Sequence, residues 1–175
     1  MRFWAKSKMT RKLPIEIDML EFLRAGKFDC LKLGQNKEWV RNNFPDPDSG
    51  WDVDLQSGGF DIWTYGNIEL HFEKDELFLI FSDDLRDLNG GKDLRVMHWI
   101  FDDPAKLDLA YVLHRLNEEK IDYKKQSDAL GVVLRLASGI ELTFENMHDA
   151  EGLSPNDYSM TSFGLVPENF RRWRV

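Results

Sequence analysis

Two short segments, residues 68–73 and 140–145, alternate strictly between apolar and polar side chains, and this feature constrains the fold most strongly. In the first segment Ile68, Leu70 and Phe72 alternate with glutamates and a histidine. Because successive side chains of a strand point to opposite faces, the pattern predicts strands with one buried face. Further strands are predicted at residues 60–65, 77–82, 95–101, 122–126, 132–137 and 159–166.

Three segments have helical signals. Residues 15–24 have apolar side chains at helical spacing, and residues 37–43 follow Asn36, a favoured N-cap. Asp103 followed by proline predicts the start of a third helix that reaches about residue 120. The chain therefore belongs to the α+β class, with an antiparallel sheet or sheets and helices packed on one face.

The helical spacing also predicts which side chains are buried. In residues 37–43 and the position after them, Trp39, Val40 and Phe44 are expected to share one face. In the third helix Leu113 belongs to the predicted buried stripe, and in the strands Leu70 is predicted to lie in the core.

The length fits one domain covering residues 1–175. The pattern I-E-L-x-F-E occurs at residues 68–73 and again at 140–145. Each half also reads as helix, strand and hairpin, so a divergent duplication with halves at residues 13–101 and 102–166 is one interpretation. The other is that two unrelated strand hairpins look alike.

The net charge of −8 is unevenly distributed. Residues 1–12 contain five basic side chains and residues 171–174 three arginines, with no acidic residue in either segment. The remaining chain has 15 basic and 31 acidic residues, a net charge of −16. Such a surface repels nucleic acid and anionic membranes and attracts a basic protein. Alternatively, the surplus charge serves only solubility.

We expect a cytoplasmic protein without a membrane-embedded segment. No apolar run follows the basic residues 1–12, as a secretion signal would require, and the longest strongly apolar stretch is residues 77–81. The single cysteine, Cys30, permits no internal disulfide and is interpreted as a small buried apolar residue.

No motif for catalysis or cofactor binding is recognisable. The four histidines lack the spacing of metal ligands, and no nucleophile, phosphate-loop or dinucleotide motif occurs. A calcium-binding loop that started at Asp46 would need an oxygen ligand at its fifth position, glycine at its sixth and glutamate at its twelfth. This sequence has Gly50, Trp51 and Ser57 at those positions, so the motif is absent. We therefore expect no catalytic residue, metal ion or cofactor, and a solvated loop at residues 46–54.

The sequence resembles a class of small bacterial proteins. The segments F-L-R-A-G-K-F at 22–28, L-x-L-G-Q-N-K-E-W-V at 31–40 and W-T-Y-G-N-I-E-L-H-F-E-K-D-E-L-F-L-I-F at 63–81 carry this resemblance. Members include immunity-type proteins encoded beside polymorphic or contact-dependent growth-inhibition toxins. The plan of helix and hairpin is also similar to that of β-lactamase-inhibitor and outer-membrane assembly lipoproteins. The chain has no lipidation cysteine near its start, which sets it apart from the lipoproteins.

The resemblance and the acidic charge together favour a non-enzymatic protein that binds and neutralises a cationic toxin domain. An enzyme with a composite site of Asp, Glu and His, or a structural or regulatory module, are the alternatives. Trp51 is the candidate aromatic anchor of the interface, although a core role would also suit it. The predicted partner-binding residues are Trp51, Asp52, Asp54, Asp83, Asp84 and Asp87.

Overall fold

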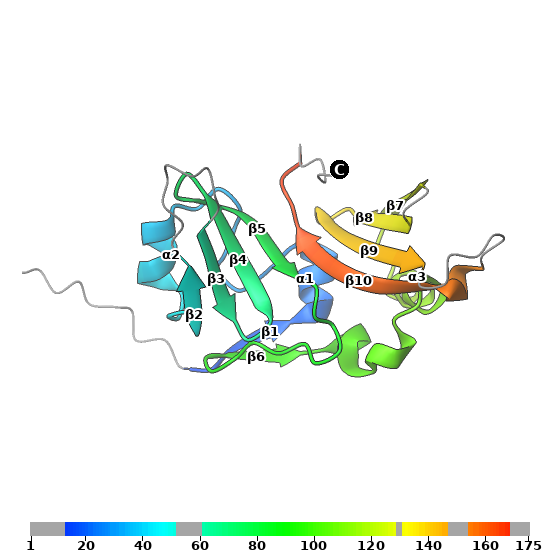
Figure 1. The fold of residues 1–175 in the computed structure, drawn as a ribbon, viewed down its shortest axis with the longest axis horizontal. Helices are drawn as coiled ribbons and strands as arrows, with labels where there is room; N and C mark the ends of the chain where they lie inside the picture. Colours follow the sequence, from blue (N-terminus) through cyan, green and yellow to red (C-terminus); the bar gives the residue numbers. More distant parts are fainter. Residues whose placement is uncertain (1–12, 52–60, 129–130, 147–153, 169–175) are drawn as a thin grey trace, which may run out of the picture.

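The computed structural model describes residues 13–51, 61–128, 131–146 and 154–168 (Figure 1). These residues form three α-helices, one sheet of eight strands and a separate pair of strands. The α+β class with an antiparallel sheet, predicted from the alternating segments, is confirmed.

The large sheet has the strand order β2-β3-β4-β5-β10-β9-β8-β7, and all its neighbouring strands are antiparallel. The pairing of β5 with β10 joins strands of the two sequence halves into one sheet. The strands are β2 (Ser49–Trp51), β3 (Asp61–Tyr65), β4 (Ile68–Glu73), β5 (Glu76–Ser82), β7 (Tyr123–Asp128), β8 (Gly131–Leu136), β9 (Ile140–Asn146) and β10 (Tyr158–Leu165).

The predicted helix at residues 15–24 is wrong in its first turn. Residues 15–18 form the strand β1 (Ile15–Asp18), which pairs in parallel with β6 (Leu94–Met97). Helix α1 (Met19–Ala25) begins only after Asp18, whose Oδ1 accepts hydrogen bonds from the backbone N–H groups of the first turn. The alternation of Ile15 and Ile17 is a strand pattern, but it is too short to distinguish a strand from a helix by itself.

Helix α2 (Lys37–Asn43) forms where the sequence predicts it. The side chain of Asn36 accepts a hydrogen bond of 2.8 Å from the backbone N–H of Glu38 and caps the helix. Val40 is buried, as predicted, whereas Trp39 is 40% exposed. Trp39 therefore lies outside the buried stripe, because it is one residue, or about 100°, away from Val40 around the helix.

The third helix begins later than predicted. The predicted strand at 95–101 ends early, since a 3-10 turn covers Trp99–Asp102 and a second covers Pro104–Lys106. Helix α3 (Leu109–Glu118) begins after Asp108, whose Oδ1 accepts a hydrogen bond from the backbone N–H of Tyr111. Asp103 makes no side-chain capping bond. It pairs with Lys106 instead, and this hydrogen bond lowers the pKa of the Asp103 carboxyl. A further 3-10 turn covers Pro155–Asp157.

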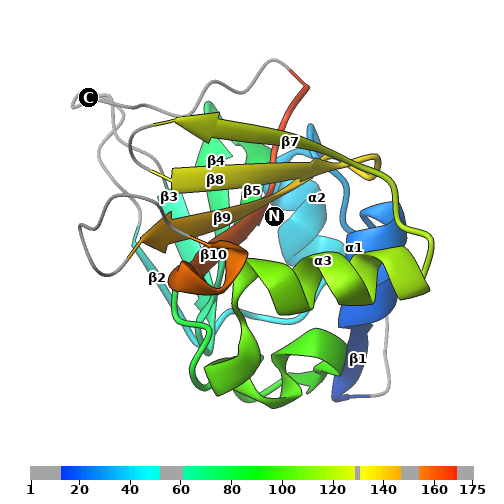
Figure 2. The same cartoon turned by 90° about the vertical axis from the view of Figure 1, so that its right-hand side faces the viewer.

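The core lies on one face of the large sheet, which we call the inner face. A row of buried side chains crosses it, in which the register pairs Trp63, Leu70, Ile80, Leu165 and Ile140 in turn. Aromatic rings connect this face to two helices, since Phe22 of α1 contacts Phe163 and Phe44, at the end of α2, contacts Tyr65. Figure 2 shows α3 next to the strands β9 and β10. The packing of all three helices on a single face stays a prediction.

Candidate functional site

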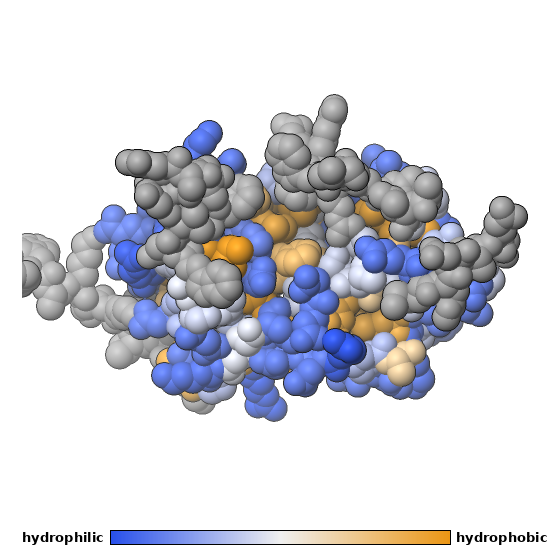
Figure 3. Space-filling view, viewed as in Figure 1, coloured by the Kyte–Doolittle hydropathy of each residue, from blue (hydrophilic) through white to orange (hydrophobic). Residues whose placement is uncertain are grey.

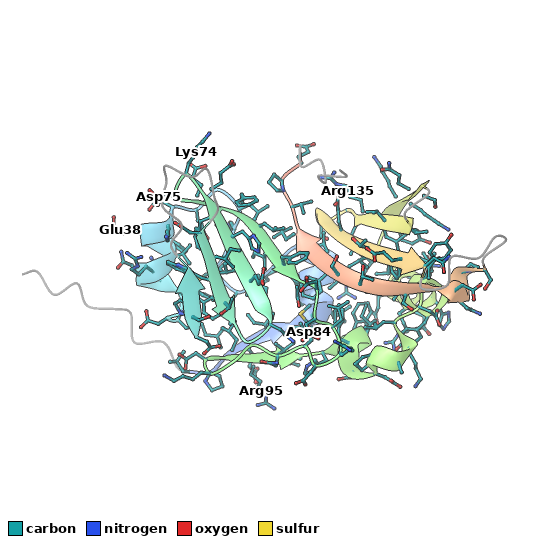
Figure 4. All side chains as sticks on the ribbon, viewed as in Figure 1. Glu38, Lys74, Asp75, Asp84, Arg95 and Arg135 are labelled. Atoms are coloured by element: carbon teal, nitrogen blue, oxygen red, sulfur yellow. The ribbon has the colours of Figure 1, made fainter. Side chains whose placement is uncertain are left out.

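Two acidic loops lie next to the turn between β3 and β4. The first covers residues 46–48, the second residues 83–93, and the turn is formed by Gly66 and Asn67. We call these three segments the acidic corner. The prediction of a loop throughout residues 46–54 is wrong at residues 49–51, which form β2 and pair with β3. Asp83, Asp84 and Asp87 follow β5 and are all exposed. Figure 4 shows Asp84 at the end of β5 that lies opposite the turn carrying Lys74 and Asp75.

Asn67 holds the backbone of the second loop in place. Its Nδ2 donates hydrogen bonds to the carbonyl oxygens of Asp84 (3.0 Å) and Asp87 (2.7 Å). Its Oδ1 accepts a hydrogen bond of 2.8 Å from the backbone N–H of Asn89. One asparagine thus uses both ends of its amide on this loop, so the acidic side chains project from a backbone that is already ordered.

Asp48 connects the first loop to the other two segments. Its Oδ2 accepts a hydrogen bond of 2.8 Å from the backbone N–H of Gly66, and its Oδ1 accepts one of 3.2 Å from that of Lys92. Gly91 has φ +64° and lies so close that a Cβ atom there would overlap the Asp48 carboxylate. The close contact therefore requires glycine at position 91.

The acidic corner has a strong negative charge. Residues 46–48 and 83–93 contain six aspartates, one arginine and one lysine, which gives a net charge of −4 for these two loops. The negative charge also acts on Tyr65. Burial, together with the charges of Asp46, Asp48 and Asp93, raises the pKa of the Tyr65 hydroxyl. Such a surface can attract and orient a cationic partner.

The predicted site residues are placed unequally. Asp83, Asp84 and Asp87 lie in the second loop, whose backbone is bonded to Asn67. Asp48 of the first loop accepts hydrogen bonds from Gly66 and Lys92 of the other two segments. The backbone of Trp51 ends β2 opposite Ile62, but its side chain lies outside the described residues. Asp52 and Asp54 also lie outside them. The role of Trp51 as an aromatic anchor therefore stays a prediction.

The described residues include no group of three or more His, Cys, Asp or Glu side chains that could hold a metal ion. The described histidines interact locally. His98 Nε2 lies 2.5 Å from the carbonyl oxygen of Leu88, and His114 lies 3.4 Å from Glu118. Cys30 is partly buried, and its thiol donates to the carbonyl oxygen of Asn43 over 3.7 Å. These contacts indicate structural roles.

Several residues in the segments that carry the resemblance, at 22–28, 31–40 and 63–81, have structural roles. Lys37 is buried against Asp61 at 2.5 Å, and its Nζ lies 5.5 Å from the centre of the Trp63 ring. The Tyr65 hydroxyl donates to the carbonyl oxygen of Pro45 over 2.8 Å. The motif thus fixes α2 and the first acidic loop to β3, which agrees with a motif that specifies fold more than task.

Sequence reasoning missed a cluster on the face of the sheet opposite the core, which we call the outer face. Glu69 Oε2 lies 2.6 Å from His71 Nε2, and the His71 ring meets Phe81 edge-on at 6.0 Å. The alternation places Glu69 and His71 on one face, but the position of Phe81 beside them depends on strand register. One signal of this cluster was present in the sequence, a histidine between two glutamates on the polar face of a strand whose other face is apolar.

A pocket of about 530 Å³ lies beside β7 and β8. Its charged lining balances, because Lys124 and Arg135 are matched by Asp122 and Glu168. Arg135 is also engaged, since it lies 3.5 Å from Glu141 and donates to the carbonyl oxygens of residues 167 and 168. The pocket therefore indicates no particular ionic ligand.

No family model, curated protein or solved structure matches this chain. Within the described ranges, no helix is long and apolar enough to cross a membrane.

Proposed function

We propose that this chain is a non-enzymatic binding protein of the immunity type, which binds and neutralises a cationic bacterial toxin domain in the cytoplasm. The observation that carries the proposal is the order of the acidic corner. Asp83, Asp84 and Asp87 are exposed, yet Asn67 and Asp48 hold the surrounding backbone with hydrogen bonds. An interface formed by ordered loops loses less conformational entropy on binding.

Charge supports the same proposal. Complementary charge accelerates the encounter of two proteins, and rapid capture suits an inhibitor that must act before its target does damage. Catalytic and intracellular toxin domains that act on nucleic acid are commonly basic, so an acidic inhibitor complements them. The resemblance of residues 22–81 to immunity-type proteins is the reason for proposing a toxin as the partner, whereas the motif residues themselves have structural roles.

The test uses the product of the gene next to the gene for this chain, which the proposal predicts to be a toxin with a basic catalytic domain. We expect the purified domain to form a stable 1:1 complex with the full chain and to lose its activity in that complex. An equally basic toxin domain from an unrelated system is the control, and it should remain free and active. If the neighbouring domain neither binds at micromolar concentration nor loses activity, the proposed function is wrong.

A further inference from the structure

One row of paired residues crosses the outer face of the sheet. The register pairs Glu69 of β4 with Phe81 of β5, Phe81 with Gly164 of β10, and Gly164 with Glu141 of β9. Paired residues of neighbouring strands point to the same side, and the strands lie about 4.8 Å apart. The Cα atoms of Glu69 and Glu141 are therefore about 14 Å apart, and one phenylalanine and one glycine lie between them.

His71 positions the first half of this row. Its imidazole Nε2 lies 2.6 Å from Glu69 Oε2, and its ring meets Phe81 at an interplanar angle of 79°. The His71 side chain is only 14% exposed, whereas that of Glu69 is 32% exposed. One partly buried imidazole thus orders both a carboxylate and an aromatic ring, and both remain accessible from the outer face.

Gly164 lies beside the ring and presents no side chain of its own. A Cβ atom at this position would lie 3.2 Å from Leu79, 3.5 Å from Phe81 and 3.6 Å from Val166. These three apolar side chains therefore surround Gly164 closely and leave little room for an added methyl group. Figure 3 shows apolar side chains gathered near the centre of this face. Gly164 is not among the glycines with positive φ, so backbone conformation alone does not require it.

The charge of the row is concentrated at the Glu69 end. Glu141 lies 3.5 Å from Arg135, which offsets its charge. On the other side, Glu69 shares its face of β4 with Glu73, and the acidic corner begins at Asp83, two residues after Phe81. A ligand that fits this end must therefore be cationic and must also offer an apolar or planar surface to Phe81.

The geometry points to a binding site for an arginine side chain of the partner protein, formed by Glu69, Phe81 and Gly164. The guanidinium stacks on Phe81 and donates hydrogen bonds to Glu69, and the methylene chain passes over Gly164, where no side chain projects. Arginine fits better than lysine because its planar group stacks on rings and pairs with carboxylates through two parallel bonds. This inference rests on the proposed function, since it supplies the contact next to the acidic corner.

The probe is the tripeptide glycyl-arginyl-glycine, blocked at both ends, and its counterpart with citrulline, which is neutral and of nearly equal shape. Each is titrated into the ¹⁵N-labelled full chain and followed by NMR. We expect the amide signals of Glu69, Phe81 and Gly164 to shift with the arginine peptide and not with the citrulline peptide. The substitution Glu69→Gln should weaken binding about tenfold, because it removes a charge-assisted pair.

Two further variants make the test specific. Glu73→Gln removes the same charge from the same face of β4 and should change the affinity by less than about twofold. Gly164→Ala adds a methyl group that crowds Leu79 and Phe81, and it should weaken binding although Glu69 and Phe81 remain. Equal losses in Glu69→Gln and Glu73→Gln would overturn the inference, because they would indicate attraction by general charge only.

Two other results would also overturn it. Shifts confined to residues 83–93 would show that the acidic corner binds cations and the row does not, which would leave the proposed function intact. A rise in affinity of about tenfold in the variant Arg171→Ala, Arg172→Ala, Arg174→Ala would show that the chain's own arginines bind the row, and it would overturn the assignment of the row to an arginine of the partner. Failure of the proposed function is recognised separately, by the absence of a complex with the toxin domain.

Discussion

At the scale of single residues, Tyr65 links the core to the acidic corner. Its side chain is buried, and its hydroxyl donates to the carbonyl oxygen of Pro45, beside Asp46. Burial and three nearby aspartates raise the pKa of this hydroxyl in the folded protein. The raised pKa means that the folded state keeps the Tyr65 proton at a pH at which the unfolded chain releases it.

This difference predicts a loss of stability in alkali. The contribution of Tyr65 is fully present below its unfolded pKa of about 10 and decreases as the pH rises above that value. The free energy of unfolding should therefore fall more between pH 8 and about pH 10.5 in the wild type than in Tyr65→Phe, as measured by urea denaturation. The other tyrosines are common to both proteins and provide the control. Equal losses would show that Tyr65 does not carry the effect.

The two leucines predicted to be buried differ in the structure. Leu70 is fully buried, whereas Leu113 is partly exposed, because the stripe of α3 that faces the core consists of Leu109, Val112 and Leu116. The prediction for Leu113 is therefore wrong. Leu113 follows Val112 directly, so it lies at the edge of the stripe, where helical spacing alone does not decide burial.

This difference gives a paired test of the core. Leu70→Ala should lower the free energy of unfolding by about 2–5 kcal/mol, since it leaves a cavity in the packed inner face. Leu113→Ala should cost less than about 2 kcal/mol, because less apolar surface is lost from the interior. Chemical denaturation of both variants measures the difference. A cost at Leu113 equal to that at Leu70 would contradict this description of α3.

At the scale of elements, strands could be predicted from the sequence better than the starts of helices. The strands β4 and β9 were predicted because strict alternation over six residues is typical of a strand with one buried face. The strand β1 was missed because it is only four residues long and its partner β6 is more than 70 residues away in the chain. The start of α3 was misplaced because Asp103 and Asp108 are both good caps, and only packing selects the second.

The candidate site was predicted in part for a related reason. The aspartates of both loops could be identified from composition, since charged residues beside glycine and proline indicate exposed loops. Their contact through Asp48 and Asn67 could not, because the bonded residues are 17 to 44 positions apart. The pairing of Phe81 with Glu69 depends on a register that includes a bulge in β5, which no local pattern reveals.

Asn67 offers a test of the order in the acidic corner. Asn67→Ala removes the donor to Asp84 and Asp87 and should lower the free energy of unfolding by about 1–2 kcal/mol. Amide hydrogen exchange of residues 84–89 should become faster, while exchange in β8 and β9 stays unchanged after correction for global stability. The exposed Asn156→Ala is the control. Unchanged exchange in residues 84–89 would show that the loop is ordered by other contacts.

At the scale of the whole molecule, the sheet unites the two halves of the sequence. The junction of β5 with β10 continues the buried row of the inner face from Leu70 to Ile140 without interruption. The recurring I-E-L-x-F-E segments form β4 and β9, each of which lies one strand away from this junction. Descent of the halves from one ancestral unit stays a prediction, because similar strands arise wherever one face is buried.

Both proposed contact surfaces lie along or next to β5, one of the two strands of this junction. β5 carries Phe81 of the outer row and ends at Ser82, directly before Asp83 of the acidic corner, so one strand connects both proposed contacts. The partner would then meet charge first and the aromatic row afterwards. Steering by charge affects mainly the rate of association, whereas contacts at the centre of an interface affect mainly dissociation.

The most direct test of this account measures the association rate of the toxin domain with the full chain at low and at physiological salt. The variant Asp83→Lys, Asp84→Lys, Asp87→Lys should associate at least about tenfold more slowly than the wild type at low salt. The difference should shrink at physiological salt, where the Debye length is about 8 Å. Reversal of Glu73, Asp75 and Glu76, at the opposite end of β4 and β5, makes the same change in net charge and should have a smaller effect. If both triple variants slow association equally, or neither does, the acidic corner is not the surface that captures the partner.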